Sequence, residues 1–266
     1  MPSRNAFLVA KMGEYLIEPG LDPRKDHVLY RDDEHLVVYL GTQEGGDDVD
    51  VNSYLIVSRG RGILIDPGGY KIFSKVLANV SKYIDPRDIE YVYICHQDPD
   101  VAGSLPLWRE VSNSKIIVHW LWTRFLPHFG FEDADSVTYQ LPDEGEAIHF
   151  GATILEFIPA HFLHSPGHFT IYDHRSKFLF TGDIGIALLD EPYIVVENME
   201  RHIQAMRPVH ERLMPTSAAI KLWLGRVRYL DVEAILPQHG AIIPKQHVKR
   251  FFDFLENLKV GIDVMR

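Results

Sequence analysis

The stretch His96-Gln97-Asp98-Pro99-Asp100 follows an apolar run at residues 91–95, and it brings one imidazole and two carboxylates within five residues. Alternate side chains of an extended segment point the same way, so these three groups can converge after the strand. Imidazole and carboxylate are common metal ligands. The same composition also suits a turn and the cap of a following helix. The stretch therefore predicts a metal site or, alternatively, a polar turn.

Three other apolar runs end in the same way. Residues 63–65 precede Asp66, residues 178–182 precede Asp183, and residues 234–238 precede His239. In open α/β sheets the functional crevice lies beyond the carboxyl ends of the strands. Four strands that each deliver a potential ligand or carboxylate at this end therefore predict one shared site at the edge of a sheet.

A second histidine cluster lies at residues 161–168, where the sequence reads HFLHSPGH. Three imidazoles in eight residues are too many for one metal site to use them all. We expect one of them to bind metal. The others are expected to orient ligands through ring N–H groups, as surrounding residues do in metalloproteins.

The remaining pattern predicts a mixed α/β layered fold. Short runs rich in β-branched and aromatic residues predict strands, at residues 35–40, 54–57, 63–65, 91–95, 115–118, 153–158, 170–172, 178–180 and 234–236. Helical periodicity predicts helices, at residues 70–84, 198–213 (with Pro208 expected to kink or end it), 217–229 and 244–258. No stretch resembles a linker, so we expect one domain over residues 1–266.

Composition excludes several classes of protein. The 266 residues carry a formal charge of −10, which argues against generic nucleic-acid binding. The longest apolar runs fall far below the roughly 20 residues of a membrane helix. Cys95 is the only cysteine, so no internal disulfide is possible and a cytoplasmic location fits best. No G-x-S-x-G, P-loop or dinucleotide-binding fingerprint is present.

Several of these motifs together resemble a known family. In sequence order they are Asn52-Ser53-Tyr54-Leu55-Ile56, Ile65-Asp66-Pro67-Gly68, His96-x-Asp98-x-Asp100, Thr181-Gly182-Asp183 and Gln238-His239-Gly240. This series resembles the metallo-β-lactamase superfamily and spans residues 35–245. Within it, Leu163-His164-Ser165-Pro166 resembles a segment of the flavodiiron proteins and the stand-alone oxygen-binding diiron proteins.

The resemblance implies an α/β fold of four layers, an αβ/βα sandwich with two mixed β-sheets. It also implies two metal ions. One would be bound by His96, Asp98 and His164, the other by Asp100 and His239, with Asp183 bridging them. His164 is preferred to its neighbours because it lies 19 residues before Asp183, which fits the spacing in that family. Asp66, His161, His168 and Tyr193 are candidates for supporting positions around the ligands.

Two positions depart from the family pattern. Asp98 stands where the diiron branch has the longer glutamate, whereas zinc hydrolases of the fold usually have histidine there. Val101 stands where a further histidine is expected. The second departure weakens a zinc-hydrolase site more than a diiron site.

Three imidazoles and three carboxylates without a thiolate favour iron or manganese, although zinc is not excluded. The resemblance implies two iron ions bridged by oxygen or hydroxide. It also implies a protein that senses or carries dioxygen, or an oxidoreductase that reduces dioxygen or nitric oxide with electrons from a separate protein. The chain ends at Arg266 without a flavodoxin-like region, so we expect no FMN. A separate redox or signalling protein and a second copy in a homodimer are the expected partners, with neither nucleic acid nor membrane.

Two alternatives remain open. A hydroxide held between two metals is a strong nucleophile at neutral pH, so a dinuclear hydrolase of the same superfamily is one. A non-enzymatic interaction module with a degenerate site is the other, because positions 98 and 101 both depart from the pattern.

Overall fold

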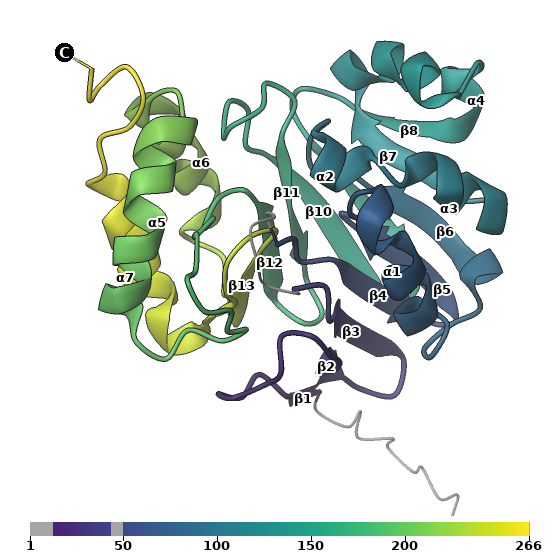
Figure 1. Cartoon of the computed structure of the whole chain (residues 1–266), viewed down its shortest axis with the longest axis horizontal. Helices are drawn as coiled ribbons and strands as arrows, with labels where there is room; N and C mark the ends of the chain where they lie inside the picture. Colours follow the sequence, from purple (N-terminus) through teal and green to yellow (C-terminus); the bar gives the residue numbers. More distant parts are fainter. Residues whose placement is uncertain (1–12, 44–49, 266) are drawn as a thin grey trace, which may run out of the picture.

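Two β-sheets lie face to face between two layers of helices (Figure 1). This computed structural model describes residues 13–43 and 50–265, so residues 1–12, 44–49 and 266 of the predicted domain lie outside the described part. Helices α1 to α4 cover one sheet and helices α5 to α7 cover the other (Figure 1). The predicted four-layer αβ/βα sandwich is therefore confirmed.

The first sheet has eight strands in sequence order. They are β1 (Glu14–Tyr15), β2 (Asp26–Arg31), β3 (His35–Leu40), β4 (Tyr54–Ser58), β5 (Arg61–Ile65), β6 (Ile89–Tyr93), β7 (Lys115–His119) and β8 (Thr138–Leu141). Strands β1 to β5 pair antiparallel, and β5 to β8 pair parallel, so the sheet is mixed. Helices connect its parallel strands, as parallel pairing requires.

The second sheet has six strands in the order β14-β13-β12-β11-β10-β9. Their bounds are β9 (Glu146–Phe150), β10 (Thr153–Pro159), β11 (Phe169–Asp173), β12 (Phe178–Gly182), β13 (Ala234–Pro237) and β14 (Ile243–Pro244). Only β12 and β13 pair parallel. The chain between these two strands forms α5 (Met199–Leu213) and α6 (Ser217–Val227), and α7 (Lys245–Glu256) follows β14.

Shorter helical segments cover the first sheet. They are η1 (Tyr70–Ile72), α1 (Phe73–Val80), η2 (Pro86–Asp88), α2 (Pro99–Ala102), α3 (Leu105–Val111), η3 (Trp120–Phe129) and α4 (Ala134–Val137). Among the described residues no helix is long and apolar enough to cross a bilayer.

The central strands are apolar on both faces, as expected for strands covered on both sides. Every residue of β12 is buried, and β4 is buried at all positions except Val57. One buried cluster joins side chains of both sheets with α1 and α3, and a second fills the space under α5, α6 and α7.

Most predicted elements are present, with two corrections. The helix predicted at residues 70–84 is a 3₁₀ turn followed by the shorter α1. Pro208 does not end α5, which continues to Leu213. Proline at this position leaves the carbonyl of Gln204 without its helical partner. Gln204 is exposed, so water can take that place.

A buried hydrogen-bonded pair joins the two sheets at the end opposite the predicted site. His35 of β3 contacts Asp173 of β11, with 2.8 Å between Nε2 and Oδ2 and neither side chain exposed. Thr153 and Ser176 donate further hydrogen bonds to the same carboxylate. Asp173 therefore has partners on both of its oxygens.

Candidate metal centre

The six predicted ligands meet where the two sheets end together. His96 follows β6, and Asp98 and Asp100 lie at the start of α2. Asp183 directly follows β12 and His239 lies two residues beyond β13. The parallel pairing of β5 with β6 and of β12 with β13 directs these carboxyl ends to the same edge.

Asp183 faces histidines on two sides. Its Oδ2 lies 2.8 Å from Nε2 of His164 and 3.7 Å from Nε2 of His96. Its Oδ1 lies 3.5 Å from Nε2 of His239. The carboxylate of Asp183 therefore separates the other five side chains into two groups.

The other two carboxylates each belong to one of these groups. Oδ2 of Asp98 lies 3.5 Å from Nε2 of both His96 and His164. Oδ2 of Asp100 lies 3.3 Å from Nε2 of His239. The groups are thus His96, Asp98 and His164 on one side and Asp100 and His239 on the other, as the resemblance implies.

The donor set fits cations better than it fits hydrogen bonding alone. Oδ1 of Asp183 is buried and has no hydrogen-bond partner among the described residues. Burying a carboxylate oxygen without a partner costs free energy unless the oxygen binds a cation. His96, Asp98 and His164 also place one ligand atom each within 4.8 Å of one another.

The electrostatics show how strongly these groups interact. Burial alone would raise the pKa of Asp183, but the hydrogen bond from His164 and the charges of His96 and His239 hold that pKa well below its usual value. Hydrogen bonds from His164 and His96 likewise lower the pKa of Asp98. Burial opposes charge on His164, yet Asp183 and Asp98 raise its pKa to about 10. The carboxylates of Asp98 and Asp183 are therefore ionised at neutral pH.

The turn alternative for the first motif is only partly realised. Asp98 occupies the N-cap position of α2, but its side chain makes no capping hydrogen bond. The carboxylate faces His96 and His164 instead. Asp100 lies in the first turn of α2 rather than on an extended segment. The three side chains thus do not converge through strand alternation, as the sequence predicted, but through the start of a short helix.

Sequence reasoning missed Gln97 as a supporting residue. Its Nε2 donates to Oδ1 of Asp98 at 3.0 Å, and its Oε1 accepts a hydrogen bond from Ser165 at 2.8 Å. Gln97 therefore links the Asp98 carboxylate to the segment that carries His164. Its position inside the first motif is the signal that would have identified it.

Sequence reasoning also missed the supporting roles of Gln43 and Asn52. Nε2 of Gln43 donates to the carbonyl of Gly240 at 2.8 Å, and Nδ2 of Asn52 donates to the carbonyls of Pro237 and Gly240 at 3.0 and 3.1 Å. These bonds from the first sheet hold the turn that carries His239. Nδ1 of His239 lies 2.7 Å from the carbonyl of Asp50, an arrangement that directs Nε2 toward the carboxylates.

Asp66 and Cys95 support His96 on the Nδ1 side of its ring. Oδ1 of Asp66 accepts the backbone N–H of Cys95 at 2.8 Å, and Sγ of Cys95 lies 3.0 Å from Nδ1 of His96. Burial raises the pKa of Asp66 to about 6. Cys95 is a free, buried cysteine, and its sulfur lies against the ring of His96.

His168 is buried beneath the segment that carries His164. Its Nδ1 contacts the carbonyl of Leu163, the residue before His164, and its Nε2 has no partner among the described side chains. Burial and the nearby charge of His96 lower its pKa to about 3. The imidazole is therefore neutral and donates its Nδ1–H to Leu163.

We expect Gly182→Ala to disturb this support. Gly182 has a φ of +54°, and a Cβ there would lie 2.3 Å from Nε2 of His168 and 3.0 Å from Sγ of Cys95. Both neighbours are buried, so the variant should lose about 1–3 kcal/mol of stability through overpacking. Urea denaturation measures this loss. Gly60→Ala, also at positive φ but in open space, is the matched control for backbone strain alone. Equal losses in the two variants would contradict the packing argument.

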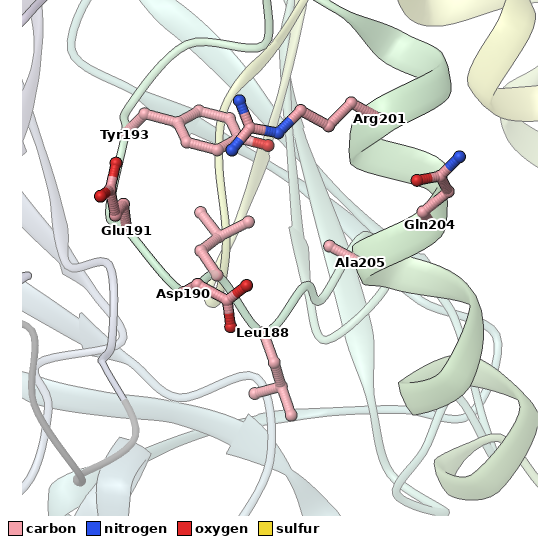
Figure 2. Close-up of a pocket in the computed structure, with 8 residues that line it drawn as sticks. Leu188, Asp190, Glu191, Tyr193, Arg201, Gln204 and Ala205 are labelled. Carbon is pink, nitrogen blue, oxygen red and sulfur yellow. The ribbon is translucent and has the colours of Figure 1, made fainter.

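Two of the predicted supporting residues lie elsewhere. Nε2 of His161 contacts the carbonyl of Asp143, and His161 belongs to a separate group with His119. The hydroxyl of Tyr193 contacts Nδ1 of His202 at 2.8 Å. Tyr193 lines a pocket between the loop after β12 and helix α5, where Figure 2 shows it beside Arg201. None of the six candidate ligands lines this pocket.

Comparison with known proteins places this geometry in a family. A family model described as "ODP family beta lactamase" matches residues 49–240. A solved structure titled "Peroxy diiron species of chemotaxis sensor ODP" is similar, with a TM-score of 0.82 and 39% sequence identity. The match covers 90% of this chain and 98% of that one.

Curated relatives are more distant and longer. An uncharacterised protein of Methanocaldococcus jannaschii is 30% identical over 207 residues, which cover 76% of this chain and 51% of the relative. A flavo-diiron protein of Clostridium acetobutylicum is 26% identical over 202 residues, which cover 73% of this chain and 50% of the relative. The chain thus spans about half the length of these relatives. With a family model that matches most of its length and a similar structure that it covers almost completely, the chain belongs to the ODP beta-lactamase family.

Proposed function

We propose that this protein holds two iron ions and binds dioxygen at the candidate metal centre. The observation that carries the proposal is the arrangement around Asp183, whose two oxygens face two separate groups of histidine and carboxylate. His96, Asp98 and His164 would hold one ion, Asp100 and His239 the other, and Asp183 would bridge them. The titles of similar structures and relatives, which refer to diiron proteins, support iron over zinc or manganese.

The chain's own residues prepare the site for this chemistry. The three carboxylates would offset the charge of two cations, and the three imidazoles present Nε2 on the side of the carboxylates. Side chains of His96, Asp183 and His239 are at most 5% exposed, whereas Asp98 and Asp100 are 37% and 35% exposed. The site is thus closed on the side of the sheets and open beside α2, where a small molecule can enter. Ferrous ions, when bound, supply the electrons that dioxygen requires.

We also propose a role in oxygen sensing, with a signalling protein as partner. The similar structure's title describes a chemotaxis sensor, which supports a sensor over a reductase. A reductase of dioxygen or nitric oxide would need a separate electron donor. A cytoplasmic location, a homodimer and a single domain over residues 1–266 complete the proposal.

Aeration of the ferrous protein tests this function. Protein purified without air and loaded with two equivalents of Fe²⁺ should gain a visible absorption band when it meets dioxygen. The same protein loaded with Zn²⁺ should show no band, since zinc has no redox chemistry. Two bound irons without any spectral change would contradict the proposal.

A further inference from the structure

A second group of side chains of the types that ligate metals lies at the same end of the sandwich. His119 ends β7, Asp143 follows β8 and His161 follows β10, so the group draws on both sheets. One ligand atom from each lies within 4.8 Å of the other two. Among the described residues, one other group meets this criterion, and it is part of the candidate metal centre.

The contacts within the group are short. Nε2 of His119 lies 2.7 Å from Oδ1 of Asp143, and Nε2 of His161 lies 2.8 Å from the carbonyl oxygen of Asp143. The rings of His119 and His161 have centroids 5.3 Å apart. Two imidazoles and one carboxylate form the donor set that binds divalent transition metals with open positions left for solvent.

The second ring nitrogen of His161 indicates that hydrogen bonding does not satisfy this group. Nδ1 of His161 is buried and has no partner among the described residues. Donation from Nε2 to the carbonyl of Asp143 leaves Nδ1 with an unused lone pair. In its neutral form the imidazole of His161 thus has a lone pair on Nδ1 that a cation can use once the ring turns about its Cβ–Cγ bond.

His119 and Asp143 are equally suited to a cation. Burial lowers the pKa of His119, so its imidazole is neutral and holds a lone pair. Binding through Nε2 would move its proton to Nδ1 and give up the long 3.3 Å bond from the N–H of Leu121. The side chain of Asp143 is 63% exposed, which gives a cation access from solvent. Nε1 of Trp120 donates to Oδ1 of Asp143 at 3.1 Å and orients the carboxylate.

We propose that His119, Asp143 and His161 bind one divalent transition-metal ion of the Zn²⁺ type, separate from the two ions of the candidate metal centre. This ion would join β7, the loop after β8 and the segment that begins at His161. Gly167 of that segment also packs against His119, since a Cβ there would lie 2.7 Å from Nδ1 of the ring. The ion would therefore anchor the segment that carries His164.

Zn²⁺ titration of the metal-free protein against a chromogenic chelator tests the site. Asp143→Asn and His161→Asn should each bind one equivalent fewer than the unmodified protein, with affinity at that site reduced at least about 100-fold. His174→Asn is the matched control, because His174 also pairs with a carboxylate, 2.9 Å from Oε2 of Glu156, but belongs to no group of three ligands in the described part of the chain. The control should bind as many ions as the unmodified protein.

A variant of the candidate metal centre separates this proposal from the proposed function. The double variant Asp98→Asn/Asp183→Asn should lower binding of both ions at that centre and leave the His119 site intact, which Co²⁺ absorption would report as one remaining set of d–d bands. Loss of these bands on adding Asp143→Asn would support the site. Unchanged Zn²⁺ stoichiometry and affinity in both Asp143→Asn and His161→Asn would overturn it, and the group would then be a hydrogen-bonded network only.

Discussion

Asp183→Asn is expected to abolish the binding of one iron ion and to weaken the binding of the other at least about 100-fold. The carboxylate of Asp183 is the single group that faces both sets of histidines. An amide keeps the size of the side chain but removes its charge and leaves one oxygen as an acceptor. Metal analysis after anaerobic loading with Fe²⁺ measures the change, and the absorption band on aeration should disappear with it.

Asp190→Asn is the matched control for this experiment. Asp190 lies on the loop after Asp183, is exposed, and lines the pocket of Figure 2 rather than the metal centre. This variant should keep two irons and the absorption band. Retention of both irons in Asp183→Asn would refute a bridging role for that carboxylate. Circular dichroism of both variants establishes that the comparison is made on folded protein.

The second large effect is expected at the opposite end of the sheets, where Asp173→Asn should destabilise the fold by about 3–5 kcal/mol. Removing one partner of a buried pair leaves the other partner's hydrogen-bonding group uncompensated. Burial alone would raise the pKa of Asp173, but His35, Ser176 and Thr153 hold it below its usual value. Urea denaturation at neutral pH measures the loss.

The sign of the pH dependence follows from the lowered pKa of Asp173. A carboxyl whose pKa is lower in the folded state contributes stability above its unfolded pKa, and this contribution is lost as pH falls through the folded pKa. The unmodified protein should therefore lose more stability than Asp173→Asn between neutral pH and pH values below the usual aspartate pKa of about 4. Parallel losses in the two proteins would contradict this assignment.

A neighbouring pair provides the control for burial. Glu156 of β10 and His174 after β11 lie 2.9 Å apart, with side chains 39% and 45% exposed. Exposed pairs contribute about 0–1 kcal/mol. Glu156→Gln should therefore change stability little, and a loss as large as that of Asp173→Asn would show that burial is not the cause.

The sequence predicted the strands and ligands that depend on local pattern. Buried strands such as β6 and β12 are continuous apolar runs, and a polar residue directly after such a run marks the end of the strand. Asp183 and His239 could therefore be placed at the edge of the sheet without coordinates. His164 needed the family resemblance, because nothing local distinguishes it from His161 and His168.

The missed elements have weak local signals. β8 and β9 read TYQL and EAIHF, short runs in which apolar and polar residues are mixed because these strands are partly exposed. The supporting role of Gln43 depends on Gly240, which lies 197 residues away, and no pattern within the sequence reports such a contact. The histidine cluster at residues 161–168 suggested a supporting role for His161, but its position beside His119 depends on how the two sheets pack.

Each sheet supplies three of the six candidate ligands: His96, Asp98 and Asp100 come from the first half of the chain, and His164, Asp183 and His239 from the second. Neither half alone presents a complete set. During synthesis on the ribosome, His239 leaves the exit tunnel last of the six. Metal loading must therefore follow translation of both halves and their association, and iron that reaches the nascent chain earlier meets only a partial, weak site.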